Sequence, residues 1–387
     1  MSAPFHTIES ARRRAEEIAR DVLAPQSSEV DRDARWPEAG LRALQRALGG
    51  LVVPQSAGGM GLGLLALARV CEALGRECGS TAICFGMHCV GSAVLAAKAT
   101  PAQATRYLEP IARGEHLTTL ALSEPGTGSH FYLPETTVAR DEAGVVVTGE
   151  KSFVTNGGHA DSYVISVRSA APNAPPGEFS CLVLPAGTPG VSWGPSWEGW
   201  GMRGNSARTM RLEGARLSAD VLLGEVGDEI WYVFQVVAPY FLIAMSGTYL
   251  GIAAAALDEA LEHLKTRRHS HSSAALAETS VLQHRVGRLW AQVERTRLLI
   301  YQAAQLGDEG APGSLPLLCA AKAEVAECAV AISNEALTLV GGRGYQQGAK
   351  LARSLRDARA AHVMAPTTDM LWTWAGRALL DQPLLAP

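Results

Sequence analysis

The sequence predicts a mostly helical α+β fold made of three parts, in the order helical, β, helical. Apolar residues recur at helical spacing over residues 1–118 and again over 229–387, whereas 119–228 holds short β-forming runs between turn formers. With 387 residues, 47% of them apolar, the chain is long enough for two or three domains around a large core. We expect these three segments to be the domains, with the two helical ones packed together and the β domain at one side.

Spacing and turn formers identify the elements of the first two segments. In the first, apolar residues recur every three or four positions around residues 41–48, 64–74 and 90–97, and glycine or proline separates these runs. In the middle segment, strands are expected at the β-rich runs 145–148, 163–167, 180–184 and 209–212. This segment is therefore expected to be a small all-β module.

The last segment is expected to be a bundle of long helices, which the periodicity places over 250–264, 281–299 and 317–339, with a loop at 307–316. Residues 230–257 carry no charge and are long enough to cross a bilayer. The stretch contains Pro239, Tyr240 and Ser246, however, and no flank rich in lysine or arginine. A helix buried inside a bundle has the same composition, so we expect a core helix and no membrane association.

Composition and missing motifs argue against several classes of function. The net charge of −4 gives no basic field for nucleic acid. The seven cysteines are odd in number and irregularly spaced, which argues against a disulfide framework and for a cytoplasmic protein. Cys84, His88 and Cys89 lack the spacing of a zinc site, so no metal site is expected. The sequence also lacks a phosphate loop, a dinucleotide-binding glycine motif, His-Glu-x-x-His and Gly-x-Ser-x-Gly.

Two glycine-rich segments carry the functional signal. Residues 122–129 read Leu-Ser-Glu-Pro-Gly-Thr-Gly-Ser, where helices give way to strands, and 153–158 read Phe-Val-Thr-Asn-Gly-Gly. Glycines let the backbone approach a ligand closely, and the serine and threonine add hydroxyl groups. An aromatic ring beside hydroxyl and backbone donors suits a flat, redox-active heterocycle. Either segment alone is also compatible with an ordinary β-turn.

Together with later markers, these segments resemble the acyl-CoA dehydrogenase family over nearly the whole chain. The later markers are 200–206 (Trp-Gly-Met-Arg-Gly-Asn-Ser), 221–225 (Val-Leu-Leu-Gly-Glu), 256–260 followed by Arg267, 339–345 (Leu-Val-Gly-Gly-Arg-Gly-Tyr) and 355–359 (Leu-Arg-Asp-Ala-Arg). The resemblance implies an N-terminal helical domain, a middle β-barrel or sandwich, and a C-terminal four-helix bundle.

The resemblance also implies FAD as the cofactor, residue by residue. Thr155 would reach toward the flavin N5, the atom that receives the hydride, and Phe153 would lie against the isoalloxazine. Arg267 would meet the pyrophosphate of a neighbouring subunit's FAD, since family members are usually homodimers or homotetramers whose sites span subunits. The implied FAD-binding residues are Leu122, Ser123, Gly128, Ser129, Phe153, Val154, Thr155, Arg267, Thr338, Gly341, Gly342 and Thr367.

The family reaction is α,β-dehydrogenation, in which a carboxylate removes the α proton of an acyl thioester while the β hydride goes to N5. This chain departs from the family at both positions that carry such a carboxylate, which fall at Ala365 and Phe241. Losing a positioned base costs roughly 100- to 10,000-fold in rate. The candidate replacements are His362, His130, Tyr240 and Asp369. His362, three residues before Ala365, is preferred because the two would share a helix face. The residues expected at the substrate are Ser129, Tyr240, Phe241 and Ala365.

A further departure concerns the acyl carrier. Pro239 and Leu242 stand where many relatives have charged residues near CoA, which suggests delivery on the pantetheine arm of a carrier protein. We expect a flavin-dependent oxidoreductase acting on the CH–CH group of an acyl thioester, on CoA or a carrier protein, in secondary metabolism. The electron acceptor would be an electron-transfer flavoprotein or O2. Two alternatives stay open, a flavin-dependent monooxygenase of the same fold and a catalytically degenerate paralogue.

Overall fold

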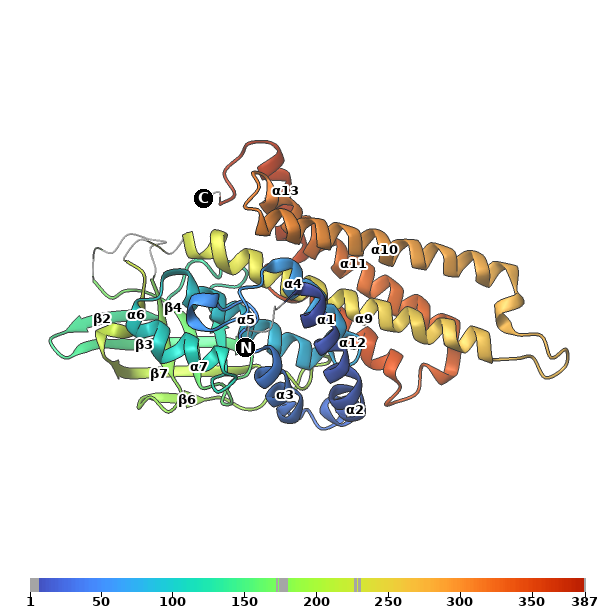
Figure 1. Ribbon diagram of the computed structural model, residues 1–387, viewed down its shortest axis with the longest axis horizontal. Coiled ribbons are helices and arrows are strands. Elements are labelled where there is room, and N and C mark those ends of the chain that lie inside the picture. Colours follow the sequence, from blue (N-terminus) through green and yellow to red (C-terminus); the bar gives the residue numbers. More distant parts are fainter. Residues whose placement is uncertain (1–6, 172, 174–179, 226–227, 229–230, 386–387) are drawn as a thin grey trace, which may run out of the picture.

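The computed structural model describes residues 7–171, 173, 180–225, 228 and 231–385. Helices come first along the chain, then strands, then helices again, so the predicted α+β class and order are confirmed. Figure 1 shows an elongated molecule in which the strands form one end, while α9, α10 and α11 extend to the other. The division of the chain into domains at 118 and 228 stays a prediction.

The N-terminal helices pack on one another and on α9, and α5 joins them to the sheet. They are α1 (Ile8–Ile18), α2 (Ala24–Arg32), α3 (Glu38–Leu48), α4 (Leu64–Gly75), α5 (Gly79–Lys98), α6 (Pro101–Gln103) and α7 (Glu109–Ala112). Helix α5 is buried along almost its whole length and contacts strand β1, as well as helix α9 of the C-terminal part. It therefore lies where the three parts of the chain meet.

A buried histidine ties α5 to its neighbours. The Nε2 of His88 lies 3.0 Å from the carbonyl oxygen of Gly49, and Nδ1 accepts the backbone N–H of Thr118 at 3.2 Å. With Nδ1 accepting, the neutral ring donates through Nε2. Complete burial lowers the pKa of His88 to about 4, so this arrangement needs the uncharged ring.

The strands form one eight-stranded sheet in the order β6-β7-β3-β2-β4-β5-β8, with β1 added parallel to β4. Their bounds are β1 (Thr118–Ala121), β2 (Thr137–Asp141), β3 (Gly144–Val154), β4 (Ser162–Ser169), β5 (Ser180–Pro185), β6 (Val191–Trp193), β7 (Arg208–Leu217) and β8 (Leu222–Leu223). All four predicted runs lie in strands. The register between β3 and β7 shifts twice, and the second shift falls between Lys151 and Val154. Such irregularities bend a strand and redirect its side chains. The second shift spans Phe153, whose side chain is exposed.

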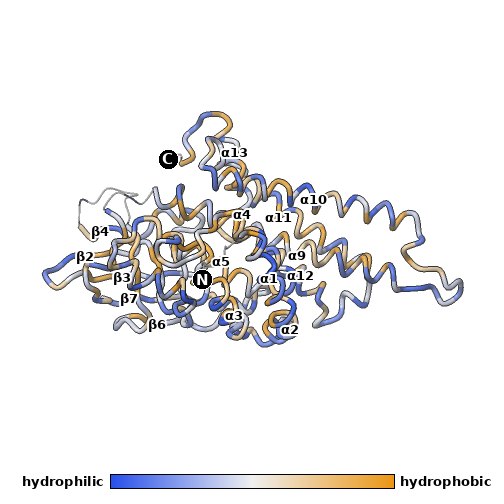
Figure 2. The backbone as a smooth tube through the Cα atoms, viewed as in Figure 1, coloured by the Kyte–Doolittle hydropathy of each residue, from blue (hydrophilic) through white to orange (hydrophobic). Residues whose placement is uncertain are grey.

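The C-terminal helices are α9 (Ala238–Thr266), which follows the π-helical turn η5 (Tyr232–Val237), α10 (Ser280–Asp308), α11 (Ser314–Val340), α12 (Lys350–Val363) and α13 (Thr368–Leu379). Helix α9 is central, because it packs against α4, α5, α10, α11 and α12. It is buried over most of its circumference, as a helix without a polar face must be. Figure 2 shows hydrophilic and hydrophobic residues alternating along α10, which lies outside it.

Two helices are long and apolar enough to cross a membrane, Gly79–Lys98 and the continuous segment Tyr232–Thr266. In each, 89% of the most apolar window is buried inside the protein. Residue 230, the first of the uncharged stretch, lies outside the described residues. The part of the stretch from 231 onward is therefore a core helix, as its interrupted composition predicts.

Candidate active site

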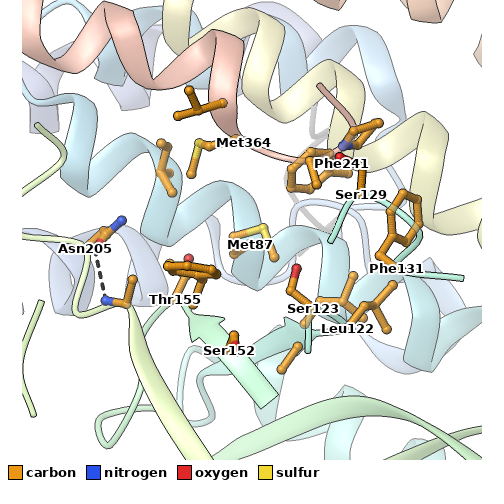
Figure 3. A pocket seen from close by; sticks show the side chains of 18 of the residues that line it. Met87, Leu122, Ser123, Ser129, Phe131, Ser152, Thr155, Asn205, Phe241 and Met364 are labelled. Atoms are coloured by element: carbon orange, nitrogen blue, oxygen red, sulfur yellow. Dashed lines mark hydrogen bonds between the residues drawn. The ribbon is translucent and has the colours of Figure 1, made fainter. Parts of the chain in front are cut away.

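A pocket of about 850 Å³ opens between the three parts of the chain. Its walls come from α5, from the segment after β1, from the end of β3, from the start of α9 and from the end of α12. Figure 3 shows Thr155, Ser123 and Leu122 on the sheet side, Met87 on α5, and Phe241 and Met364 on the opposite side. The accessible lining is mostly apolar, with a few serine and threonine hydroxyls.

A buried ion pair anchors the segment 122–129. Lys151 is fully buried and donates to the carboxylate of Glu124 and to Ser166 Oγ, the latter at 2.9 Å. The same carboxylate accepts the backbone N–H groups of Glu135 and Thr136. Burial lowers the pKa of Lys151 to about 8, although the neighbouring carboxylate opposes the shift. The pair therefore fixes where the chain turns after β1.

Gly128 and Phe153 leave unfilled space in the pocket lining. Gly128 has φ +53°, and a Cβ added there would meet no atom within 4 Å. Phe153 has φ +54° and leaves 66% of its area exposed, although it lines the pocket. The Phe153 ring meets Trp197 edge to face at a centroid distance of 6.0 Å and is otherwise largely exposed. An exposed aromatic ring and an unobstructed glycine in one pocket lining, together with Ser123 and Thr155, fit a flat heterocycle with polar edges. The residues present therefore fit a flavin.

The turn after Phe153 is held by an asparagine. Asn156, fully buried with φ +61°, accepts the Trp36 Nε1–H at 2.9 Å and donates to the Cys84 carbonyl at 3.0 Å. Its backbone N–H donates to the carbonyl of Asn205 at 3.1 Å. A left-handed conformation outside glycine persists only where its surroundings fix it, and these three bonds do so. Thr155 is thereby held in the pocket wall.

Helix α12 fixes the segment 200–206 on another side. The Asp357 carboxylate accepts the Met202 N–H at 2.7 Å, and burial raises its pKa to about 6. Arg356 pairs with Asp31 and donates to the Trp200 carbonyl at 2.8 Å. These contacts place Met202 in the pocket lining.

The three residues after α12, Met364, Ala365 and Pro366, form what we call the strap. Lys322 of α11, fully buried, donates to the carbonyls of Ala361 at 2.6 Å, Met364 at 3.3 Å and Pro366 at 3.0 Å. Burial lowers the pKa of Lys322 to about 7, whereas three carbonyl acceptors favour the ammonium form. The strap is thus fastened from behind, and all three of its residues line the pocket.

Titratable groups are scarce around this pocket. Among the described residues that line it, only Glu124 and Glu150 carry a titratable side chain. Glu124 is already bonded to Lys151 and two backbone amides, and Glu150 lies on β3, 3.2 Å from Arg211 Nε. The lining of the strap and of α9 therefore offers no proton acceptor.

The structure brings most of the predicted near-site residues together. The predicted residues in the lining are Leu122, Ser123, Gly128, Ser129, Phe153, Thr155, Phe241 and Ala365. Phe241 and Ala365, the two positions where the resemblance predicts a family carboxylate, thus face one cavity. Val154, Tyr240 and Thr367 do not line it; Thr367 occupies the N-cap position of α13 without a side-chain capping bond. Burial raises the pKa of Tyr240 to about 12, which makes it a poor base at neutral pH.

His362 is not among the lining residues. Its Nδ1 lies 3.3 Å from Thr368 Oγ1 and 3.9 Å from Glu327 Oε1, and burial lowers its pKa. Helix α12 ends at Val363, so the three-residue helical spacing does not reach Ala365. The structure therefore gives the replacement-base hypothesis no support from geometry.

Four predicted FAD residues lie at the other end of the helices. Arg267 follows the last residue of α9, a 29-residue helix that is about 43 Å long, whereas the pocket is at its start. Thr338, Gly341 and Gly342 lie at the end of α11, and a Cβ added at either glycine would meet no atom within 4 Å. These residues cannot contact a ligand in the pocket of the same chain.

Some lining residues carried no sequence signal that singled them out. Met87, Met202, Met364 and Phe131 come from four separate segments and meet only in the folded chain. Lys322 was detectable, because it is the only lysine in the helical run 314–340 and follows seven apolar residues.

Comparison with known proteins gives a consistent result over most of the chain. The family models described as acyl-CoA dehydrogenase N-terminal, middle and C-terminal domain match residues 6–115, 119–215 and 231–380. The cyclohex-1-ene-1-carbonyl-CoA dehydrogenase of Geobacter metallireducens is 30% identical over 94% of this chain and 95% of its own length. The human mitochondrial short-chain specific acyl-CoA dehydrogenase is 30% identical over 92% of this chain and 85% of its own.

Solved structures agree. Butyryl-CoA dehydrogenase from Megasphaera elsdenii superposes with a TM-score of 0.90 at 25% identity, covering 98% of this chain and 100% of that one. The prolyl acyl carrier protein oxidase AnaB has a TM-score of 0.85 at 21% identity, covering 96% and 98%. The second likeness concerns the fold alone.

Proposed function

Because this chain belongs to the acyl-CoA dehydrogenase family, it is an FAD-dependent oxidoreductase of acyl thioesters, and we propose that the pocket described above holds both the flavin and the acyl group. The observation that carries this assignment is that the exposed Phe153 ring and the unobstructed Gly128 both line one mostly apolar cavity. When bound, FAD supplies a hydride acceptor.

In this proposal the sheet side holds the flavin. The exposed face of Phe153 packs against the ring system, and Thr155 presents its hydroxyl to the ring's polar edge. Leu122, Ser123, Gly128 and Ser129 line the turn that the Glu124–Lys151 pair fixes. Val154 and Thr367 would act through the backbone that they fix, because neither lines the pocket.

The opposite side orients the acyl group and excludes water. Phe241, Met364 and Ala365 present apolar surface there, and no described lining residue on that side can take a proton. The family's ordinary α,β-dehydrogenation therefore lacks its usual base in this chain. This absence also keeps the flavin-dependent monooxygenase as a second candidate, since a monooxygenase does not need that carboxylate.

We further propose that the protein works as a homodimer or homotetramer. Arg267, Thr338, Gly341 and Gly342 lie too far from their own pocket to contact its flavin. The open space at the two glycines suits close approach by a neighbouring subunit's cofactor.

The start of α9 bears on how the acyl group is delivered. Leu242 is fully buried in α9, and Pro239 is the second residue of that helix, so neither offers a charge to CoA. We infer a carrier protein's pantetheine arm as the donor of the acyl group, an electron-transfer flavoprotein or O2 as the acceptor, and a cytoplasmic location.

An anaerobic absorbance titration of the purified protein tests the proposal. The starting spectrum reports bound flavin, and CoA, pantetheine and carrier-protein thioesters are then added in turn. Bleaching of the long-wavelength flavin band by a thioester supports oxidoreduction. A flavin that every thioester leaves oxidised, but that O2 and NAD(P)H turn over, favours the monooxygenase. A protein that binds no FAD contradicts the proposal.

A further inference from the structure

The side of the pocket opposite the sheet, where the acyl group is proposed to lie, has no charged side chain among its described residues. Phe241, Ala365, Met87 and Met364 contribute only hydrocarbon, a thioether or an aromatic ring there. The two described titratable groups of the lining are bound elsewhere, Glu124 to Lys151 and Glu150 to Arg211. Figure 3 shows Phe241 on the side of the pocket that α9 forms.

This surface is unsuited to removing a proton from carbon. Deprotonation next to a thioester carbonyl builds negative charge, which needs a base and a nearby electrophile. The face of a phenyl ring carries partial negative charge, so it repels an anion and attracts a cation. Phe241 stands where the resemblance to the family predicts a carboxylate. The site therefore favours a transition state in which positive charge develops on the substrate.

We propose that the carbon oxidised in this pocket carries an amine, so that the substrates are aminoacyl thioesters; this inference rests on the proposed function. The neutral amine nitrogen uses its lone pair to form a C=N bond. The C–H bond breaks with both electrons, and the hydride passes to the oxidised flavin. The carbon loses two electrons and the flavin gains two. When the substrate is a secondary amine, the iminium ion that forms then releases its N–H proton to water. No protein base takes part at carbon.

The pocket prepares the amine for this step. An apolar environment lowers the pKa of a bound amine, so the neutral form with a free lone pair is favoured. The cation that forms lies beside the Phe241 ring, where cation–π attraction is expected to contribute about two- to thirty-fold in rate or affinity. No unpaired carboxylate among the described lining residues would hold the amine as an inactive ammonium ion.

The first test compares matched thioesters on the anaerobic holoprotein. Prolyl and pipecolyl pantetheine are compared with their carbocyclic counterparts, cyclopentanecarbonyl and cyclohexanecarbonyl pantetheine, and with the N-acetylated amines. We expect flavin bleaching by the free amines alone, because acetylation withdraws the lone pair. Equal bleaching by the carbocycles overturns this inference and leaves the proposed function standing. Reaction with none of the six, nor with any straight-chain thioester, removes both.

A second test reads binding rather than turnover. Calorimetry compares two unreactive pantetheine amides, one carrying the planar cation N-methylpyridinium-2-carbonyl and one carrying neutral benzoyl. We expect Phe241→Leu to weaken the cation about two- to thirty-fold relative to the neutral amide, and Phe241→Tyr, which keeps the ring, to preserve the ratio. An unchanged ratio in Phe241→Leu overturns the role of the ring, and circular dichroism confirms that the variants fold.

Discussion

Replacing Ala365 by glutamate should convert this pocket to ordinary acyl dehydrogenation. Ala365 lines a cavity of about 850 Å³, so the added side chain can extend into free space. It would enter beside Met364 and Phe241, where the acyl group of the thioester is expected to lie next to the flavin. A positioned general base contributes roughly 10²- to 10⁴-fold, and we expect a gain of that order for a straight-chain acyl thioester.

The pH dependence gives this prediction a second signature. The apolar lining disfavours a carboxylate, so the pKa of the new glutamate should lie above its ordinary value of about 4.3. Only the ionised form accepts a proton, so the new activity should rise with pH through that raised pKa. The wild-type protein has no such group on this side of the described lining and should show no such rise.

Stopped-flow measurement of anaerobic flavin reduction by butanoyl pantetheine tests both points. Ala365→Gln is the matched control, since it has nearly the same size and no basic oxygen at neutral pH. An equal gain in the glutamine variant would show that space, not a base, limits the wild type. A glutamate variant that binds FAD and thioester but gains nothing would refute the placement of Ala365 at the reacting carbon.

Three further variants test the framework around the pocket. Lys322→Met removes the donor that three strap and helix carbonyls share, and we expect urea unfolding to show a loss of about 2–5 kcal/mol. His88 has a folded pKa of about 4, below the ordinary 6.5, so the unfolded state binds a proton that the folded state does not. The free energy of unfolding should therefore fall by up to about 3 kcal/mol as the pH falls from 6.5 to 4. His88→Gln, which has no such proton to bind, should make this pH dependence weaker. Glu124→Gln leaves the buried Lys151 ammonium without its counter-charge, so stability should fall by about 3–5 kcal/mol and FAD content per subunit should drop; normal content and stability would contradict the anchoring role.

The order of helical and β segments was predictable because each carries its own periodicity over a long window. All four predicted strands were found, whereas β1, β2, β6 and β8 were not predicted. Strands β6 and β8 span only three and two residues, and β1 spans four, so no alternation has room to develop. They are strands because neighbours pair with them, which local sequence does not record.

The candidate site was predictable where it depends on short motifs. The segments 122–129 and 153–158 contribute residues to one cavity, which Phe241 and Ala365 also line. His362 illustrates the limit of local spacing. Lys322 binds carbonyls at the end of α12 from a different helix, and the chain leaves the helix before Ala365. That tertiary contact decides which side chains meet, and it cannot be read from a helical repeat.

The central claim is that this pocket contains no base for the α carbon, and hydrogen exchange tests it most directly. The FAD-loaded protein is incubated anaerobically in D2O with cyclohexanecarbonyl pantetheine, and deuterium at the α carbon is followed by mass spectrometry. We expect exchange in the wild type no faster than in buffer, and clear exchange in Ala365→Glu. Exchange catalysed by the wild type would show that a protein group reaches the α proton and would contradict the claim.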